Sequence, residues 1–167
     1  MPQRPYDERL LRKTFDVARR ARAAGEHPFG SLLADKDGNV LQQQLNGYAS
    51  GGGDRTAHAE RLLAQWARVN LSEEELASCT LYTSAEPCAM CSGTIYWVGI
   101  GRVVFGLAEH DMKVFTGAHD ENPTLDLPCR VVFEAGQRPT EVVGSLLAEE
   151  AAELHAGYWT KDEGARA

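Results

Sequence analysis

Two stretches decide the fold: RTAHAERLLAQW at residues 55–66 and SAEPCAMCSG at residues 84–93. In the first, apolar residues at helical spacing predict an amphipathic helix that ends near Asn70, yet its first turn carries His58 and Glu60. Protein cores rarely bury such groups without partners. In the second, Pro87 suits the first position of a helix that runs to about Val98. Both stretches therefore predict a helix that begins with chemically active side chains.

Cys88 and Cys91 are spaced so that both thiols project from one side of a helical first turn. The helix N-terminus lowers thiol pKa values, and zinc prefers thiolates together with imidazole. A catalytic zinc site uses three protein ligands and leaves one position for water, so we predict His58 as the third ligand and Glu60 as an unbound carboxylate that accepts a proton. A redox pair, two buried thiols and a purely structural zinc site are the alternatives.

Composition places this chain among ordinary globular proteins, with 167 residues, 43% hydrophobic and 25% charged. We expect one domain over residues 1–167. No apolar run reaches the roughly 20 residues that span a bilayer, and MPQRPYDERLLRKTF lacks the features of a secretory signal, so a cytoplasmic location is expected. The net charge of −7 argues against nucleic acid as a partner.

Periodicity and turn residues predict the order of the elements along the chain. We expect a helix over 6–24, followed by two strands within 30–46 that turn at Asp37-Gly38. A glycine-rich loop then leads to the helix that ends near Asn70, with Asp54 or Thr56 as its N-cap. A polar turn or short helix is expected over 72–78. A strand over 79–84, the helix over 87–98, strands over 102–106 and 129–135 separated by an irregular segment, and a helix over 140–157 follow. This order predicts an α/β fold, a three-layer α/β/α sandwich around a mixed sheet of about five strands.

The spacing His-Ala-Glu followed by Pro-Cys-Ala-Met-Cys matches the H-x-E…P-C-x-x-C signature of zinc deaminases. The chain resembles the cytidine-deaminase-like superfamily, in the branch of guanine deaminases and tRNA-editing adenosine deaminases, from HPFGSLLADKDGNV to GRVVFG. The resemblance implies an α/β/α sandwich, a homodimer, one Zn²⁺ per chain on His58, Cys88 and Cys91, and hydrolytic release of an exocyclic amine as ammonia by zinc-activated water. It implies that Glu60 carries the proton.

Substrate contacts are also implied by this resemblance. Asn46 matches an asparagine that donates to the base or sugar, Ala59 lies between ligand and acid, and Trp97 and Phe29 match aromatic pocket positions or are core residues. Further substrate contacts are implied later in the chain. Asp120 or Glu121 is expected to hydrogen-bond a purine amine, and Tyr158 and Trp159 are expected to close the site.

The expected substrate is a free nucleobase, with guanine first and cytosine, isoguanine or an aminated triazine as alternatives. Arg55 stands where relatives commonly have proline, and this departure leaves the specificity open. A tRNA-editing adenosine deaminase and a catalytically silent zinc domain used for assembly are the competing functions. We expect the other histidines to be surface or loop groups rather than extra metal ligands: His27, His110, His119 and His155. We expect the other cysteines to be buried apolar groups in strands: Cys79 and Cys129.

Overall fold

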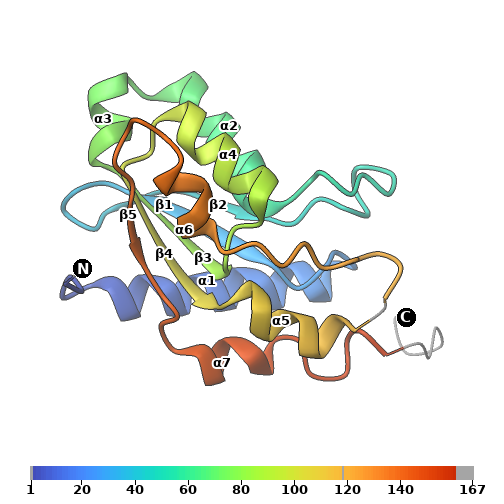
Figure 1. Ribbon diagram of the computed structural model, residues 1–167. Coiled ribbons are helices and arrows are strands. Elements are labelled where there is room, and N and C mark those ends of the chain that lie inside the picture. The colour runs from blue at the N-terminus through green and yellow to red at the C-terminus, as the bar shows by residue number, and fades with distance from the viewer. Residues whose placement is uncertain (1, 118, 161–167) are drawn as a thin grey trace.

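The computed structural model describes residues 2–117 and 119–160, which form a mixed five-stranded sheet between two layers of helices (Figure 1). The strand order is β2 (Val40–Leu45), β1 (Gly30–Ala34), β3 (Thr80–Ala85), β4 (Arg102–Leu107) and β5 (Glu141–Val143). Strand β1 runs antiparallel to both of its neighbours, and β3, β4 and β5 are parallel. The predicted α/β/α sandwich with about five strands is confirmed.

Seven helices in the described residues cover the two faces of the sheet. One layer contains α1 (Asp7–Ala23), α5 (Glu109–Thr116) and α7 (Ala148–Glu153), and the other contains α2 (Ala59–Asn70), α3 (Glu73–Ser78), α4 (Ala89–Val98) and α6 (Cys129–Glu134) (Figure 1). None of these helices is both long and apolar enough to cross a membrane.

Successive side chains of a strand point to opposite faces of the sheet. The central strands carry apolar residues at consecutive positions, so both faces of the sheet are apolar. Leu32, Tyr82 and Val104 pack against the layer of α1, α5 and α7. Their neighbours Leu33, Leu81 and Val103 pack against the other layer. Each fully buried aliphatic side chain contributes about 1.5–3 kcal/mol relative to an exposed one, so both layers are held to the sheet.

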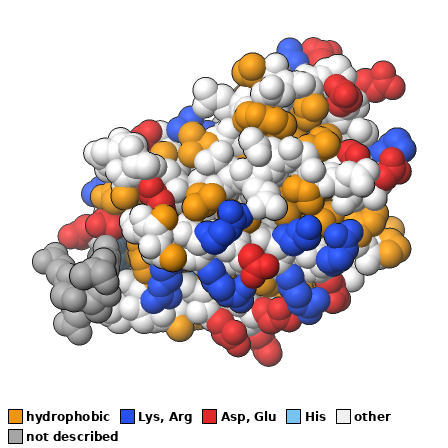
Figure 2. Space-filling view, turned by 180° about the vertical axis from the view of Figure 1, so that it is seen from behind, with side chains coloured by type: hydrophobic (Ala, Val, Ile, Leu, Met, Phe, Trp, Pro, Cys, Tyr) orange, Lys and Arg blue, Asp and Glu red, His pale blue; other side chains and the backbone are white. Residues whose placement is uncertain are grey.

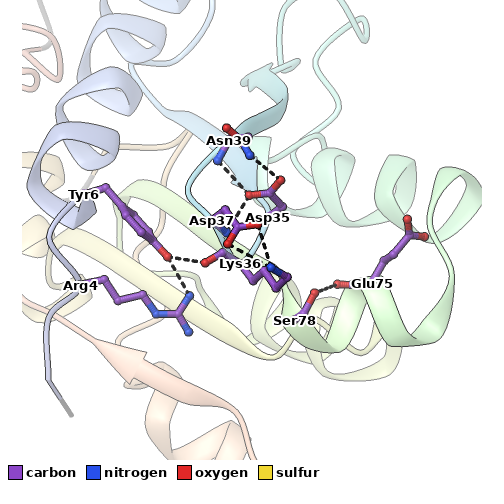
Figure 3. A network of polar contacts seen from close by, with 8 residues as sticks. All are labelled: Arg4, Tyr6, Asp35, Lys36, Asp37, Asn39, Glu75 and Ser78. Atoms are coloured by element: carbon purple, nitrogen blue, oxygen red, sulfur yellow. Dashed lines mark hydrogen bonds and ion pairs between the residues drawn. The ribbon is translucent and has the colours of Figure 1, made fainter.

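The turn between β1 and β2 forms where Asp37-Gly38 predicts it. Gly38 has a φ of +82°, a conformation that glycine adopts without strain. Asp35 accepts hydrogen bonds from the backbone N–H groups of Asp37 and Asn39, both at 2.9 Å (Figure 3). The hydroxyl of Tyr6 donates to the carbonyl of Lys36 at 2.8 Å and ties this turn to the start of α1 (Figure 3).

A buried ion pair joins α1 to the sheet. Arg102, which is 2% exposed, donates two hydrogen bonds of 2.8 Å to the fully buried Asp7. The hydroxyl of Tyr82 adds a third at 2.7 Å. Burial by itself would raise the pKa of Asp7, but the hydrogen bonds from Arg102 and Tyr82 outweigh it and hold this pKa below its usual value. Asp7 is therefore a buried ionised group that joins the start of α1 to the start of β4.

Three expectations about secondary structure are wrong. Residues 129–134 form helix α6 rather than a strand, because Cys129 and Phe133, four residues apart, are buried while Val131 is 51% exposed. The segment 140–157 is not one helix: β-branched residues extend as β5 beside β4, and α7 starts only after Leu147. The segment between residues 106 and 129 was expected to be irregular, but it contains helix α5 and is irregular only after that helix ends at Thr116.

The sequence predicted the start of one helix correctly and misplaced the N-cap residues of two others. The polar turn over 72–78 is helix α3, with Ser72 and Glu75 in a capping box. Helix α4 begins at Ala89 with Cys88 as its N-cap, so Pro87 precedes the helix instead of opening it. Neither predicted residue caps α2, because Asp54 accepts hydrogen bonds from Thr56 within the preceding loop.

Candidate active site

The site forms where four strand ends and two helix N-termini meet at one end of the sheet. Strands β3 and β4 end there, β2 ends there, and the antiparallel β1 begins there. Ligands of α/β proteins bind at the carboxyl ends of parallel strands. Helices α2 and α4 also point their N-termini to this end, because they bring His58 and Cys88 together as N-cap residues.

His58, Cys88 and Cys91 form the candidate metal centre. The Nδ1 atom of His58 lies 3.5 Å from the Sγ atom of Cys88 and 3.5 Å from that of Cys91. Ligand atoms at about 2.0–2.3 Å from a tetrahedral zinc ion lie about 3.5–3.8 Å from one another. Within the described residues, this is the one group of three potential ligands whose donor atoms all lie within 4.8 Å. The donor set and its spacing therefore fit zinc.

The protonation of these three residues favours a cation between them. Hydrogen bonding to Cys91, and then to His58, lowers the pKa of Cys88 to about 4 despite its burial. The same hydrogen bond between the two sulfurs, together with burial, raises the pKa of Cys91. Burial alone would lower the pKa of His58, but its hydrogen bond to Cys88 and the charge of Glu60 raise it. A divalent cation would replace the protons that this cluster shares.

Glu60 lies beside the metal ligands without belonging to their group. It is 5% exposed, and its Oε1 atom accepts a hydrogen bond of 2.7 Å from Thr83. Burial raises its pKa. Residues two apart do not share a helix face, but His58 is extended, with φ −69° and ψ 144°, and so its side chain can face the same pocket as Glu60.

A cavity of about 380 Å³ opens beside these residues. This volume is in the range of small-molecule sites. Five carboxyl groups line it, and Arg55 is the one Lys or Arg side chain among its described lining residues. The carboxyl groups that line it are Asp54, Glu60, Glu86, Glu109 and Glu121.

Three of the predicted substrate contacts line this cavity: Phe29, Asn46 and Glu121. Asn46 is 3% exposed, and its Oδ1 atom accepts a hydrogen bond of 2.9 Å from the backbone of Tyr48. The carboxyl of Glu121 lies 2.8 Å from the Nε2 atom of His27. The structure thus selects Glu121 over Asp120 as the acidic residue of this loop that reaches the cavity.

The structure places the other predicted contacts outside the cavity lining. Ala59 is fully buried at the start of α2. Trp97 is 80% exposed, because the buried side of α4 is formed by Cys91 and Ile95 and Trp97 projects away from it. Tyr158 and Trp159 make ring contacts with His27, with ring centroids 6.2 Å and 5.2 Å away. They therefore contact a residue of the cavity lining without lining the cavity themselves.

Two of the other histidines, His27 and His155, lie in loop or turn segments as expected, but the structure buries both of them. His27 is 6% exposed and stacks on Tyr48 with ring centroids 4.2 Å apart, so both residues line the cavity. His155 is 1% exposed and accepts a hydrogen bond of 3.1 Å from Trp159. Cys79 and Cys129 are buried as predicted, although Cys79 follows α3 and Cys129 opens α6.

Sequence reasoning missed Glu86 and Glu109, two buried carboxyl groups of the cavity. Glu86 follows β3, and its two oxygens accept hydrogen bonds from the backbone N–H groups of Glu109 at 2.9 Å and Cys129 at 2.8 Å. Burial, followed by the charges of Cys88 and Glu60, raises the pKa of Glu109 to about 8. The available signal was their position, since Glu86 directly follows β3 and Glu109 follows the parallel strand β4 by two residues.

Known proteins similar to this chain agree with this geometry. Residues 4–107 match the cytidine and deoxycytidylate deaminase zinc-binding region. A probable cytosine deaminase of Schizosaccharomyces pombe is 39% identical over 92% of this chain and 92% of its own length. A tRNA-specific adenosine deaminase of Haemophilus influenzae is 35% identical over 77% of this chain and 78% of its own.

A solved structure shows that the similarity extends to the fold. The guanine deaminase of Nitrosomonas europaea is 27% identical, with a TM-score of 0.73 over 92% of this chain and 84% of its own. The family match covers β1 to β4 together with the histidine and both cysteines of the candidate metal centre. The chain therefore belongs to the cytidine and deoxycytidylate deaminase family of zinc-binding enzymes.

Proposed function

We propose that this deaminase acts on a free nucleobase or a related amino-heterocycle, replacing an exocyclic amine by a carbonyl oxygen and releasing ammonia. Guanine and cytosine are the first candidates, because the similar proteins include a guanine deaminase and a probable cytosine deaminase. Isoguanine and aminated triazines share the same amine-bearing ring carbon. The observation that carries the proposal is the cavity of about 380 Å³, lined by five carboxyl groups and one Lys or Arg side chain, beside the candidate zinc ligands.

The charge of the cavity supports a neutral substrate that is rich in N–H groups. Carboxyl oxygens accept hydrogen bonds from ring N–H and amino groups, whereas they repel phosphate. Arg55 is exposed and is the one Lys or Arg residue of the described lining, so a nucleotide phosphate would meet little positive charge there. A free base satisfies these groups better than a nucleotide does.

Glu60 is the proposed proton carrier of the reaction. Zinc, when bound by His58, Cys88 and Cys91, supplies Lewis-acid activation of water. Glu60 accepts one proton of the attacking water and delivers it to the ring nitrogen next to the reacting carbon. It then takes the second proton of that water from the new hydroxyl group and delivers it to the departing amine, leaving the carbonyl oxygen. One C–O bond forms, the exocyclic C–N bond breaks, and one water is consumed for each ammonia released.

The cavity residues are proposed to orient the base. The ring of Phe29 offers an apolar face for the base, the amide of Asn46 can donate a hydrogen bond to it, and Glu121 can accept one from an amino group. Tyr158 and Trp159 are proposed to close the site indirectly, because they pack against His27, which faces Glu121.

Deamination of tRNA is the second candidate, favoured by the 35% identity to a tRNA-specific adenosine deaminase. The net charge of −7 stands against it. Figure 2 shows Lys and Arg side chains in a band across one face of the molecule, with Asp and Glu side chains beside and below them. Two exposed arginines of α1 are paired with acids, Arg12 with Glu150 and Arg19 with Asp16. We therefore rank tRNA below free bases.

An ammonia-release screen tests the proposal. Purified zinc-loaded protein is assayed with guanine, cytosine, adenine, isoguanine, their nucleosides, aminated triazines and a tRNA. Ammonia from at least one free base, with no more than trace release from tRNA, is expected. Release from tRNA alone would reject the free-base proposal, and release from no substrate would favour the silent assembly domain, although that domain would have no need of Glu60 as an unbound carboxyl group.

We also propose a homodimer through the outer face of α4. This helix has no charged residue; on its outer side Met90, Gly93 and Thr94 are half-buried and Trp97 is exposed. Val69 of α2 and Val131 of α6 add exposed apolar surface, at 81% and 51%. Light scattering should give twice the chain mass for wild type and the chain mass for Trp97→Glu; a monomeric wild type would reject the dimer.

A further inference from the structure

Glu109 is a buried carboxyl group of the cavity that the roles described above leave without a task. It is the first residue of α5 and follows the end of β4 by two positions. It is 8% exposed and lines the cavity together with His58, Glu60 and Cys88. Its backbone N–H donates to Glu86 at 2.9 Å, so the start of α5 is fixed in place.

The other buried glutamates show what a structural role looks like in this fold. Glu26 accepts hydrogen bonds from the backbone N–H groups of Ala49 at 2.6 Å and Ser50 at 2.8 Å. Glu86 likewise uses both oxygens on backbone N–H groups, and Glu60 accepts from Thr83. The carboxyl of Glu109 makes no hydrogen bond or ion pair with any residue that the structure describes.

A mostly buried carboxyl without protein partners lowers stability unless water or a ligand in the cavity bonds it. Such groups are found at sites where a ligand supplies the missing partner. Glu109 faces the cavity from a position that Glu86 holds rigidly, and a rigid position is what selective recognition requires. The missing partner is therefore expected to come from the molecule that fills the cavity.

We propose that Glu109 is a specificity-determining residue whose carboxyl group hydrogen-bonds an N–H group of the bound base other than the amine that leaves. The inference rests on the proposed deamination of free bases. It selects bases that keep a second N–H donor, such as the ring N–H of cytosine or guanine, over analogues in which that donor is methylated. Loss of the carboxyl should thus reduce the discrimination between a base and its methylated analogue.

The test compares Glu109→Leu, Glu109→Gln and two control variants. Asp111→Asn removes an exposed charge from the same helix, and Glu86→Gln disturbs a carboxyl with a structural role. For whichever of cytosine or guanine the wild type deaminates, kcat and KM are measured for the base and for its series of ring-N-methylated analogues. Thermal unfolding and zinc content are measured for every variant.

Glu109→Leu should lower kcat/KM for the base about 10- to 100-fold, with Glu109→Gln intermediate and Asp111→Asn unchanged. The ratio of kcat/KM between the base and one methylated analogue should shrink by a similar factor. Zinc content should stay at the wild-type level, and the Tm of Glu109→Leu should equal or exceed that of wild type because an unpaired carboxyl is gone. Glu86→Gln should lower the Tm.

The inference is overturned if Glu109→Leu keeps kcat/KM within about twofold of wild type, a change too small for a lost hydrogen bond. It is also overturned if Glu109→Leu loses Tm as Glu86→Gln does while the discrimination against methylated bases stays unchanged. A wild type that deaminates no free base contradicts the proposed function itself, and this inference with it. An active wild type with an indifferent Glu109 contradicts the inference alone.

Discussion

The hydroxyl of Thr83 donates a hydrogen bond of 2.7 Å to the carboxyl of Glu60. Thr83 is fully buried in β3, and its oxygen also lies 3.3 Å from the hydroxyl of Ser31, which donates to it from the neighbouring β1. The proposed proton carrier on α2 is thus oriented by the two central strands of the sheet. This contact joins the rigid core of the fold to the candidate active site.

Thr83→Val should lower kcat about 5- to 10-fold, because the loss of one hydrogen bond removes about 1–1.5 kcal/mol of orientation. The valine side chain has nearly the same shape, so zinc content and Tm should change little. Steady-state kinetics and metal analysis measure both effects. Thr83→Ser keeps the hydroxyl and should retain most of the activity; equal kcat values for Thr83→Val and wild type would show that Glu60 needs no such support.

Removal of zinc should inactivate the enzyme and lower its Tm, since a metal that binds the folded state stabilises it. Cys88→Ala should reproduce both effects, with zinc content falling from about one ion per chain and activity falling by more than about 100-fold. Cys79→Ala is the matched control, because Cys79 is a buried thiol outside the ligand group, just before the start of β3 and so at the opposite end of that strand from the site. Full zinc content in Cys88→Ala would exclude Cys88 as a ligand.

Asp7→Asn should destabilise the protein by about 3–5 kcal/mol, because Arg102 would remain buried without its charged partner. The folded-state pKa of Asp7 lies below its unfolded value of about 3.9, so the ion pair contributes fully above that pH. Its contribution is lost as the pH falls through the folded-state pKa, since the unfolded chain then binds the proton more readily.

Urea unfolding at several pH values measures this contribution. The free energy of unfolding should differ between wild type and Asp7→Asn at neutral pH, and the difference should shrink below about pH 4. Asp16→Asn, which breaks an exposed pair with Arg19, should cost no more than about 1 kcal/mol. A difference for Asp7→Asn that does not depend on pH would mean that packing, and not charge, accounts for the loss.

The parts of the fold that the sequence predicted are those with strong local signals. Alternation and the Asp37-Gly38 turn predicted β1 and β2, and the apolar stripe of 62–69 predicted α2. The segments 129–135 and 140–157 were misjudged because short apolar runs suit either a strand or a helix. Pairing with β4 decides for β5, and the burial of Cys129 and Phe133 decides for α6.

In the candidate site, too, the residues with a strong sequence signal were predicted correctly and the others were misplaced or missed. Spacing alone predicted the grouping of His58, Cys88 and Cys91, because each lies at a helix end with its own sequence signal. Trp97 was assigned to the pocket by resemblance, but the rotation of α4 turns it outward. The one sequence signal for Glu109 was its position just after β4, and the parallel arrangement of β3 and β4 places it in the same cavity as Cys88.

The most direct test of this account measures zinc content and ammonia release together in Glu60→Gln. The account predicts about one zinc ion per chain, as in wild type, and a loss of kcat of roughly 10²- to 10⁴-fold on the base that the wild type deaminates. Substantial ammonia release from Glu60→Gln, or full activity of metal-free wild type, would contradict the central claim that a carboxyl group off the metal carries the proton.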